Sequence, residues 1–161
     1  MGVSGCGKTT VAGILARDLA WPFEEGDALH PRSNIEKMAE GQPLTDEDRV
    51  RWLTAIADWV EKRLHSNENG LITCSALKRS YRDLINRRGS GVIFVFLSGS
   101  KPAIAQRLAA RQAHFMPASL LDSQFADLQV PQPHEPHIRV AIGPPPGAIA
   151  QSIIRELGLM A

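Results

Sequence analysis

The chain begins with Met1 and continues as Gly2-Val3-Ser4-Gly5-Cys6-Gly7-Lys8-Thr9, and this stretch decides the fold. It matches the pattern G-x-x-x-x-G-K-[ST], whose glycines let backbone N–H groups turn inward around phosphate groups. In this pattern the lysine reaches the β- and γ-phosphates, and the hydroxyl of the next residue contacts Mg²⁺. The stretch therefore predicts a phosphate-binding loop, with Lys8 on the phosphates and Thr9 on the metal ion.

An ordinary glycine turn before a helix is the alternative interpretation of this stretch. Gly5, the second threonine Thr10 and the apolar helix face downstream argue against that alternative; this face carries Val11, Ile14, Leu15 and Leu19. We therefore expect residues Gly2 to Thr10 to bind a nucleoside triphosphate. The dipole of the following helix adds positive charge at the same place.

Short apolar runs alternate with longer helical patterns along the rest of the chain, which favours an α/β fold with a parallel sheet. We expect strands at Phe23–Glu25, Leu71–Cys74, Val92–Leu97 and Ile138–Ile142. We expect helices at Lys8–Ala20, Asp46–Ser66, Arg79–Arg88, Lys101–Arg111, Ala118–Leu128 and Gly147–Leu157. Thr45 is the expected N-cap of the longest helix, because three acidic residues follow it in the first turn.

One expected element does not occur in the sequence. A phosphate-binding loop joins a strand to a helix, but only Met1 precedes this loop. The sequence therefore predicts that the first, central strand of the sheet is missing from this chain. Burying about five apolar side chains of such a strand contributes on the order of 10 kcal/mol, which is comparable to the whole stability of a domain. An upstream start and a truncated nucleotide-binding protein with weak catalysis are both open explanations.

The composition limits the classes of protein that the chain can belong to. Its 161 residues fit a single domain, and the net charge of +1 provides no general attraction for nucleic acid or an anionic membrane. The longest apolar run, Val92–Leu97, is far shorter than the ~20 residues of a membrane span. Cys6 and Cys74 form no disulfide framework, so we expect a cytoplasmic protein with reduced thiols.

The distribution of arginine and proline points to a small-molecule kinase. The guanine-specific signature N-K-x-D does not occur in the sequence, and the chain is too short for a motor ATPase. Arg107 and Arg111 lie four residues apart, on one face of a helix that leads into a proline-interrupted segment. Phosphoryl transfer requires positive charge and exclusion of water, which a lid over about residues 112–136 supplies. A solvated basic face is the alternative for these two arginines.

Longer motifs resemble the gluconate kinase (gluconokinase) family of P-loop small-molecule kinases. The resemblance runs from Met1 to about Pro131 and rests on Gly26-Asp27-Ala28-Leu29-His30-Pro31, Asn34-Ile35-Glu36-Lys37-Met38, Gly41 to Arg49, Cys74 to Lys78, Tyr81-Arg82-Asp83, His114-Phe115-Met116 and Ser123-Gln124-Phe125. It implies phosphorylation of D-gluconate to 6-phospho-D-gluconate with ATP and Mg²⁺. It also implies a single three-layer domain, like that of nucleoside monophosphate kinases, over residues 1–161, and it favours a homodimer as the assembly.

The chemistry of gluconate suggests roles for the residues of these motifs. A guanidinium grips a carboxylate with two parallel hydrogen bonds, so Arg49 and Arg82 are the first candidates for the substrate carboxylate. Lys78 and His30 are further candidates for the same site. Asp27 follows a strand end, where ligands bind in open α/β sheets, and it could accept the proton of the reacting hydroxyl. Surface arginines and a turn aspartate are the alternatives.

The resemblance implies three further roles. Arg111 resembles the lid arginine that neutralises the transferring phosphate, so it joins Lys8 and Asp27 as a candidate catalytic residue. Arg107 resembles the residue that packs on the adenine ring. Glu25 occupies the place of an acid that assists Mg²⁺ through water. A related kinase of another small metabolite, such as shikimate, could bind its anionic substrate with the same cationic residues, Arg49 and Arg82.

Overall fold

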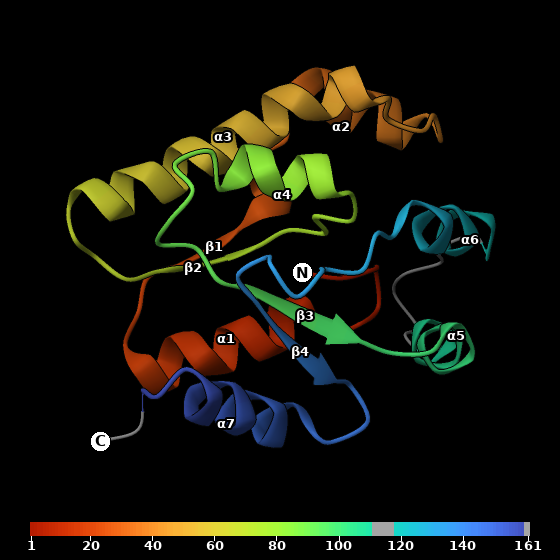
Figure 1. Cartoon of the computed structure of the whole chain (residues 1–161). Coiled ribbons are helices and arrows are strands. Elements are labelled where there is room, and N and C mark those ends of the chain that lie inside the picture. The colour runs from red at the N-terminus through yellow and green to blue at the C-terminus, as the bar shows by residue number, and fades with distance from the viewer. Residues whose placement is uncertain (111–117, 160–161) are drawn as a thin grey trace.

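The structure is a computed structural model that describes residues 1–110 and 118–159. Its helices form two layers around the strands (Figure 1). One layer holds α2 (Arg32–Ala39), α3 (Asp46–His65) and α4 (Arg79–Ile85), and the other holds α1 (Lys8–Leu19) and α7 (Pro146–Glu156). At one end lie α5 (Lys101–Ala109) and α6 (Ala118–Asp127). The three-layer α/β fold predicted from the sequence is confirmed.

The strands form two parallel pairs. β1 (Phe23–Glu25) pairs with β2 (Leu71–Thr73), and β3 (Phe94–Ser98) pairs with β4 (His137–Ala141). Met1 lies between the two pairs: its ammonium donates to the Val95 carbonyl at 2.5 Å and its carbonyl accepts from the Leu97 amide at 3.0 Å. The next amide, of Gly2, donates to the Ser75 carbonyl at 3.1 Å. Residues 1 and 2 thus bridge the pairs where a central strand was expected.

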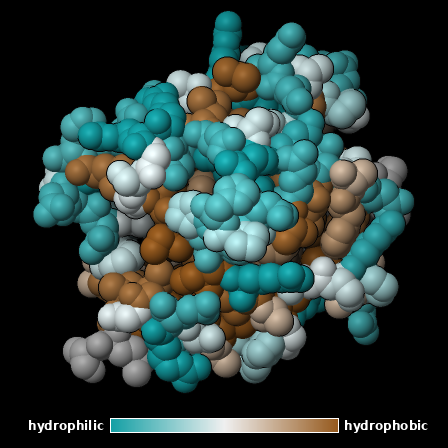
Figure 2. All heavy atoms as spheres, in the orientation of Figure 1, coloured by the Kyte–Doolittle hydropathy of each residue, from teal (hydrophilic) through white to brown (hydrophobic). Residues whose placement is uncertain are grey.

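An apolar cavity of about 400 Å³ extends from this bridge between β2 and β3. Its walls include Val11 and Leu15 of α1, Val60 of α3, Ile153 of α7, and residues 71–74 and 92–95 of the strands. Burial in this environment lowers the pKa of the Met1 ammonium to about 6. Figure 2 shows hydrophobic side chains exposed across the middle of the face in view, with hydrophilic side chains around them. The cavity therefore lies beside the two residues that bridge the strand pairs.

Two groups of buried side chains form the core, one on each side of the cavity. The first packs α1, α5 and α7 against β3 and β4, with Val11, Leu15, Leu97, Ile104, Val140 and Ile153 among its members. The second packs α3 and α4 under β1 and β2, with Trp52, Leu53, Ile56, Cys74, Tyr81 and Ile85. The apolar stripes that predicted these helices are therefore the faces that the fold buries. None of the helices in the described part of the chain is long and apolar enough to cross a membrane.

Thr45 is the N-cap of α3, as expected, and the structure shows that the cap is reciprocal with Asp48. The Thr45 hydroxyl accepts from the Asp48 amide at 3.2 Å, and the Asp48 carboxylate accepts from the Thr45 amide at 2.9 Å. Both bonds satisfy amides that have no partner within the helix. This cap fixes the first turn of α3, which carries Asp46 and Arg49.

Two short helices that the sequence did not predict lie between β1 and α3. A 3-10 turn covers Gly26–Leu29, and α2 follows after Pro31. The buried Asn34 of α2 donates from Nδ2 to the Asp48 carbonyl at 2.9 Å, and Lys37 forms a 2.8 Å ion pair with the Asp48 carboxylate. These contacts attach α2 to the first turn of α3 and so fix one wall of the region around Asp27.

Candidate functional site

The phosphate-binding loop has the backbone conformation that its glycines predict. Gly2, Gly5 and Gly7 all have positive φ, at 138°, 80° and 96°. A Cβ on Gly5 would meet Leu108 of α5 at 2.7 Å, whereas a Cβ on Gly7 would meet no atom within 4 Å. The space beside Gly7 is therefore open, directly at the N-terminus of α1. Backbone amides and a helix dipole at an open concave position fit a polyphosphate.

The side chains of the loop agree with this arrangement. The ammonium of Lys8 donates to the carbonyls of Gly2 and Val3 at 3.1 Å each, so it lies over the loop. Thr9 and Thr10 are exposed in the first turn of α1, whereas Cys6 is buried. The Ser4 amide donates to Oε1 of Gln124 at 2.7 Å, which attaches α6 to the loop. Gln124 belongs to one of the motifs that carry the family resemblance, but no role was predicted for it.

Glu25 is the last residue of β1 and lies beside Thr73 of β2. The Thr73 hydroxyl donates to Glu25 Oε2 at 2.7 Å and accepts from the Gly26 amide at 3.3 Å. No group of three or more acidic, histidine or cysteine side chains that could bind a metal ion occurs within residues 1–110 and 118–159. Mg²⁺ in kinases keeps several waters and binds mainly phosphate oxygens, so the exposed Thr9 hydroxyl fits one ligand position of such an ion.

Asp27 and His30 lie on the turn that follows β1. Asp27 is exposed, and the His30 ring stacks on the Trp52 ring with centroids 4.2 Å apart and an interplanar angle of 15°. The Trp52 indole donates to the Gly26 carbonyl at 2.6 Å. Burial lowers the pKa of His30; the Asp27 charge opposes this shift and the Arg49 charge adds to it. The charges of Asp27 and Arg49 thus both act on His30, so the structure brings these three residues together, and their role as an acceptor site stays a prediction.

Arg49 and Lys78 meet at one carboxylate, that of Asp46. Lys78 Nζ lies 2.9 Å and 3.0 Å from the two Asp46 oxygens, and Arg49 Nη1 lies 3.5 Å from Oδ1. The Tyr81 hydroxyl donates to the same carboxylate and accepts from Arg49 Nη1 at 3.2 Å. We call Arg49, Lys78 and Tyr81 the clamp. Sequence reasoning missed Tyr81 and Asp46, although both occur in the motifs quoted above.

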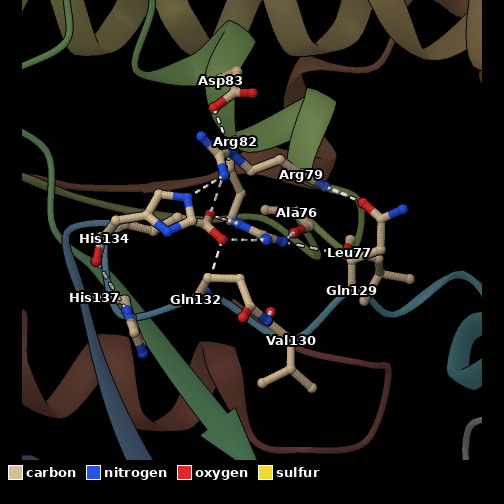
Figure 3. Close-up of polar contacts among 11 residues, drawn as sticks. Ala76, Leu77, Arg79, Arg82, Asp83, Gln129, Val130, Gln132, His134 and His137 are labelled. Carbon is tan, nitrogen blue, oxygen red and sulfur yellow. Dashed lines mark hydrogen bonds and ion pairs between the residues drawn. The ribbon is translucent and has the colours of Figure 1, made fainter.

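Arg82 does not join the clamp, and this corrects the sequence prediction. Its guanidinium is buried and forms two bonds with Glu135, Nε to Oε2 at 2.6 Å and Nη2 to Oε1 at 3.1 Å. Nη1 donates to the carbonyls of Ala76 and Leu77 at 3.0 and 3.2 Å (Figure 3). Every nitrogen of the guanidinium is thus engaged by the protein. Arg82 is a structural residue that holds the turn before Lys78.

The ion pair belongs to a wider set of polar contacts between α4 and the segment before β4. Glu135 also accepts from the Gln132 amide at 2.8 Å, and Arg82 holds the pKa of its carboxyl at about 2. Arg79 contacts Asp83 at 2.9 Å and the His134 ring at 2.6 Å, and its amide donates to Gln129 at 2.6 Å (Figure 3). These contacts fix the chain on both sides of the site without taking part in it.

The expected lid is only partly described. Arg111 and the His-Phe-Met motif at 114–116 lie outside the described residues, so their predicted roles stay predictions. The half-buried Arg107 of α5 donates from Nη2 to the carbonyl of Ile142, after the end of β4. Its packing on adenine is untested.

Known proteins resemble this chain over nearly its whole length. A family model described as "Shikimate kinase" matches residues 4–155. The gluconokinase of Gluconobacter oxydans (strain 621H) is 50% identical over 156 residues, which cover 97% of this chain and 88% of that protein. The thermoresistant gluconokinase of Escherichia coli (strain K12) is 46% identical, over 87% of this chain and 80% of that protein. A gluconokinase crystal structure from Sinorhizobium meliloti 1021 superposes with a TM-score of 0.88 at 45% identity, covering 99% of this chain and 89% of that one.

Proposed function

Because the chain belongs to the gluconokinase family of P-loop kinases, we propose that it transfers the γ-phosphoryl group of ATP to D-gluconate and forms 6-phospho-D-gluconate. The observation that carries this proposal is the 50% identity to a gluconokinase over 97% of the chain. The clamp beside Asp27 supports it, because a sugar acid offers a carboxylate at one end and a reacting hydroxyl at the other.

The donor side of the reaction rests on the phosphate-binding loop. The loop amides and the N-terminus of α1 hold the β- and γ-phosphates, and Lys8 leaves the carbonyls of Gly2 and Val3 to neutralise charge that develops on them. Thr9 and, through water, Glu25 would hold Mg²⁺, which supplies charge neutralisation on the phosphate oxygens. Arg111 adds positive charge from the lid, and Arg107 lies against the adenine.

The acceptor side rests on Asp27 and the clamp. The 6-hydroxyl oxygen of gluconate forms the new bond to phosphorus as the bond from phosphorus to the β-phosphate oxygen breaks, and ADP leaves. The hydroxyl proton passes to the Asp27 carboxylate, which is exposed at the end of β1. Arg49 and Lys78 hold the substrate carboxylate, so the chain of the sugar acid lies between the clamp and the loop. His30 lines this path against Trp52.

The gluconokinase relatives do not favour the two alternatives, a shikimate-like kinase and a weak nucleotide-binding protein. A coupled assay of ADP release tests all three with gluconate, shikimate and nucleoside monophosphates as acceptors. We expect gluconate to give the highest kcat/KM by a wide margin. Equal rates with all acceptors, or none above the ATPase background, would refute the proposal.

We further propose that the reaction takes place in the cytoplasm, since both cysteines are free and buried. A homodimer is the assembly that the family resemblance favours. Sedimentation of the purified chain at two concentrations distinguishes it from a monomer.

A further inference from the structure

The clamp already holds a carboxylate that belongs to the protein. Asp46 accepts from all three of its members, and it is the shared partner of Arg49 and Lys78. Hydrogen bonds from Tyr81 and Lys78 lower the pKa of Asp46, so the group is ionised at neutral pH. A substrate carboxylate needs the same donors.

The charges around the clamp balance while Asp46 is in place. Arg49 and Lys78 carry two positive charges, and Asp46 together with Asp127, whose Oδ1 lies 3.9 Å from Lys78 Nζ, carries two negative ones. These four charges therefore cancel, and Arg49 and Lys78 attract an incoming anion more strongly when the Asp46 carboxylate turns away.

The local structure allows Asp46 to leave without disturbing its neighbours. Its side chain is 60% exposed, and the helix start is held by the Thr45 and Asp48 cap rather than by Asp46. Tyr81 is buried in the core, and the side chains of Arg49 and Lys78 are only 26% and 25% exposed. The donors are thus fixed more firmly than the carboxylate that they hold.

We propose that Asp46 is an internal occupant of the clamp, which the carboxylate of the acceptor replaces on binding. This inference rests on the proposed function and adds to it a residue that sets the affinity for the acceptor. A ligand that must displace an internal group has an apparent affinity that is reduced by the fraction of molecules in which the clamp is free. A neutral polyol cannot replace the carboxylate, so it leaves Asp46 in place and gains nothing from the clamp. Asp46 therefore weakens the binding of an anionic acceptor and leaves the binding of a neutral polyol unchanged.

The test compares Asp46→Asn with Glu47→Gln in the full chain. Both substitutions remove one negative charge from the first turn of α3, but Glu47 has no contact with the clamp among the described residues. Steady-state kinetics give KM for gluconate, KM for ATP and kcat for each protein. D-gluconamide, which has the same polyol and no charge, is measured as a competitive inhibitor.

We expect Asp46→Asn to lower KM for gluconate about twofold to fivefold, the range that an exposed ion pair contributes. KM for ATP and inhibition by gluconamide should not change, and Glu47→Gln should match the parent protein. An unchanged or higher KM for gluconate in Asp46→Asn overturns the inference, as does an equal fall in Glu47→Gln. If the parent protein does not phosphorylate gluconate at all, the proposed function fails instead, so the two failures are distinguishable.

Discussion

Replacing Glu135 by glutamine tests the role that the structure gives to Arg82. The side chains of this ion pair are 1% and 5% exposed, so the substitution leaves a guanidinium buried without its counter-charge. Removing one partner of a buried pair costs about 3–5 kcal/mol of unfolding free energy. Glutamine can still accept one hydrogen bond, which places the expected loss at about 3 kcal/mol. For a chain of this size that corresponds to a fall in Tm of roughly 6–12 °C.

Urea and thermal unfolding at pH 7, followed by circular dichroism, measure this loss. Glu36→Gln is the matched control, because Glu36 pairs with Arg32 at 2.8 Å with both side chains largely exposed. We expect this control to lose less than about 1 kcal/mol. The double variant Arg82→Met with Glu135→Leu should recover much of the stability, since it removes both buried charges. A Glu135→Gln protein within about 1 kcal/mol of the parent would refute the reasoning.

The same pair predicts how stability depends on pH. The pKa of Glu135 falls from 4.5 to about 2 in the folded protein. The unfolded chain therefore binds a proton at higher pH than the folded one, and the contribution of Glu135 is fully present above pH 4.5. It is lost as the pH falls through 4.5 toward 2. The difference in stability between the parent and Glu135→Gln should shrink over this range, and a constant difference would contradict the assignment.

Three further predictions concern the loop, the clamp and the cavity. Lys8→Met should lower kcat by about 100-fold or more at unchanged Tm, because it removes charge that stabilises the transition state; a smaller loss would contradict the loop assignment. Arg49→Gln should raise KM for gluconate at least about tenfold and leave KM for ATP unchanged, and equal effects on both would remove Arg49 from the acceptor site. Five apolar β-branched residues added before Met1 should raise Tm by several degrees over a glycine-serine extension of equal length, since they can fill the cavity and pair with β2 and β3. Equal Tm values for the two extensions would show that the cavity does not accept a strand.

Much of the fold could be predicted from the sequence because each long element has a strong local signal. The apolar stripe of α3 and its cap at Thr45 predicted that helix to within one residue. The strand at Phe94–Ser98 was displaced by one or two residues, because Val92 and Ile93 continue the apolar run before pairing begins. The segment Arg32–Ala39 has few apolar residues and no side-chain cap, so its helix had no local signal.

The candidate site was predicted less well, since its contacts join distant parts of the chain. Arg49 and Arg82 are the same residue type, and the sequence does not distinguish their surroundings. Only the fold shows that Arg82 forms an ion pair with Glu135, 53 residues away. The clamp likewise joins α3 to α4 through Asp46, which the sequence indicates only as a favourable acid in a first helical turn. Motif resemblance pointed to this region, and packing separates the fully engaged Arg82 from the side chains of the clamp.

The stacking of His30 on Trp52 makes the indole an optical reporter of this region. The ring is in van der Waals contact with an imidazole, and its N–H is bonded to the carbonyl just before Asp27. A protonated imidazole quenches indole emission, whereas burial lowers the pKa of His30 and keeps its ring neutral at pH 7. Protonation of His30 should therefore dim Trp52, at a lower pH than an ordinary histidine requires. With Trp21 and Trp59 replaced by phenylalanine, the emission of Trp52 should report movement of the turn that carries Asp27.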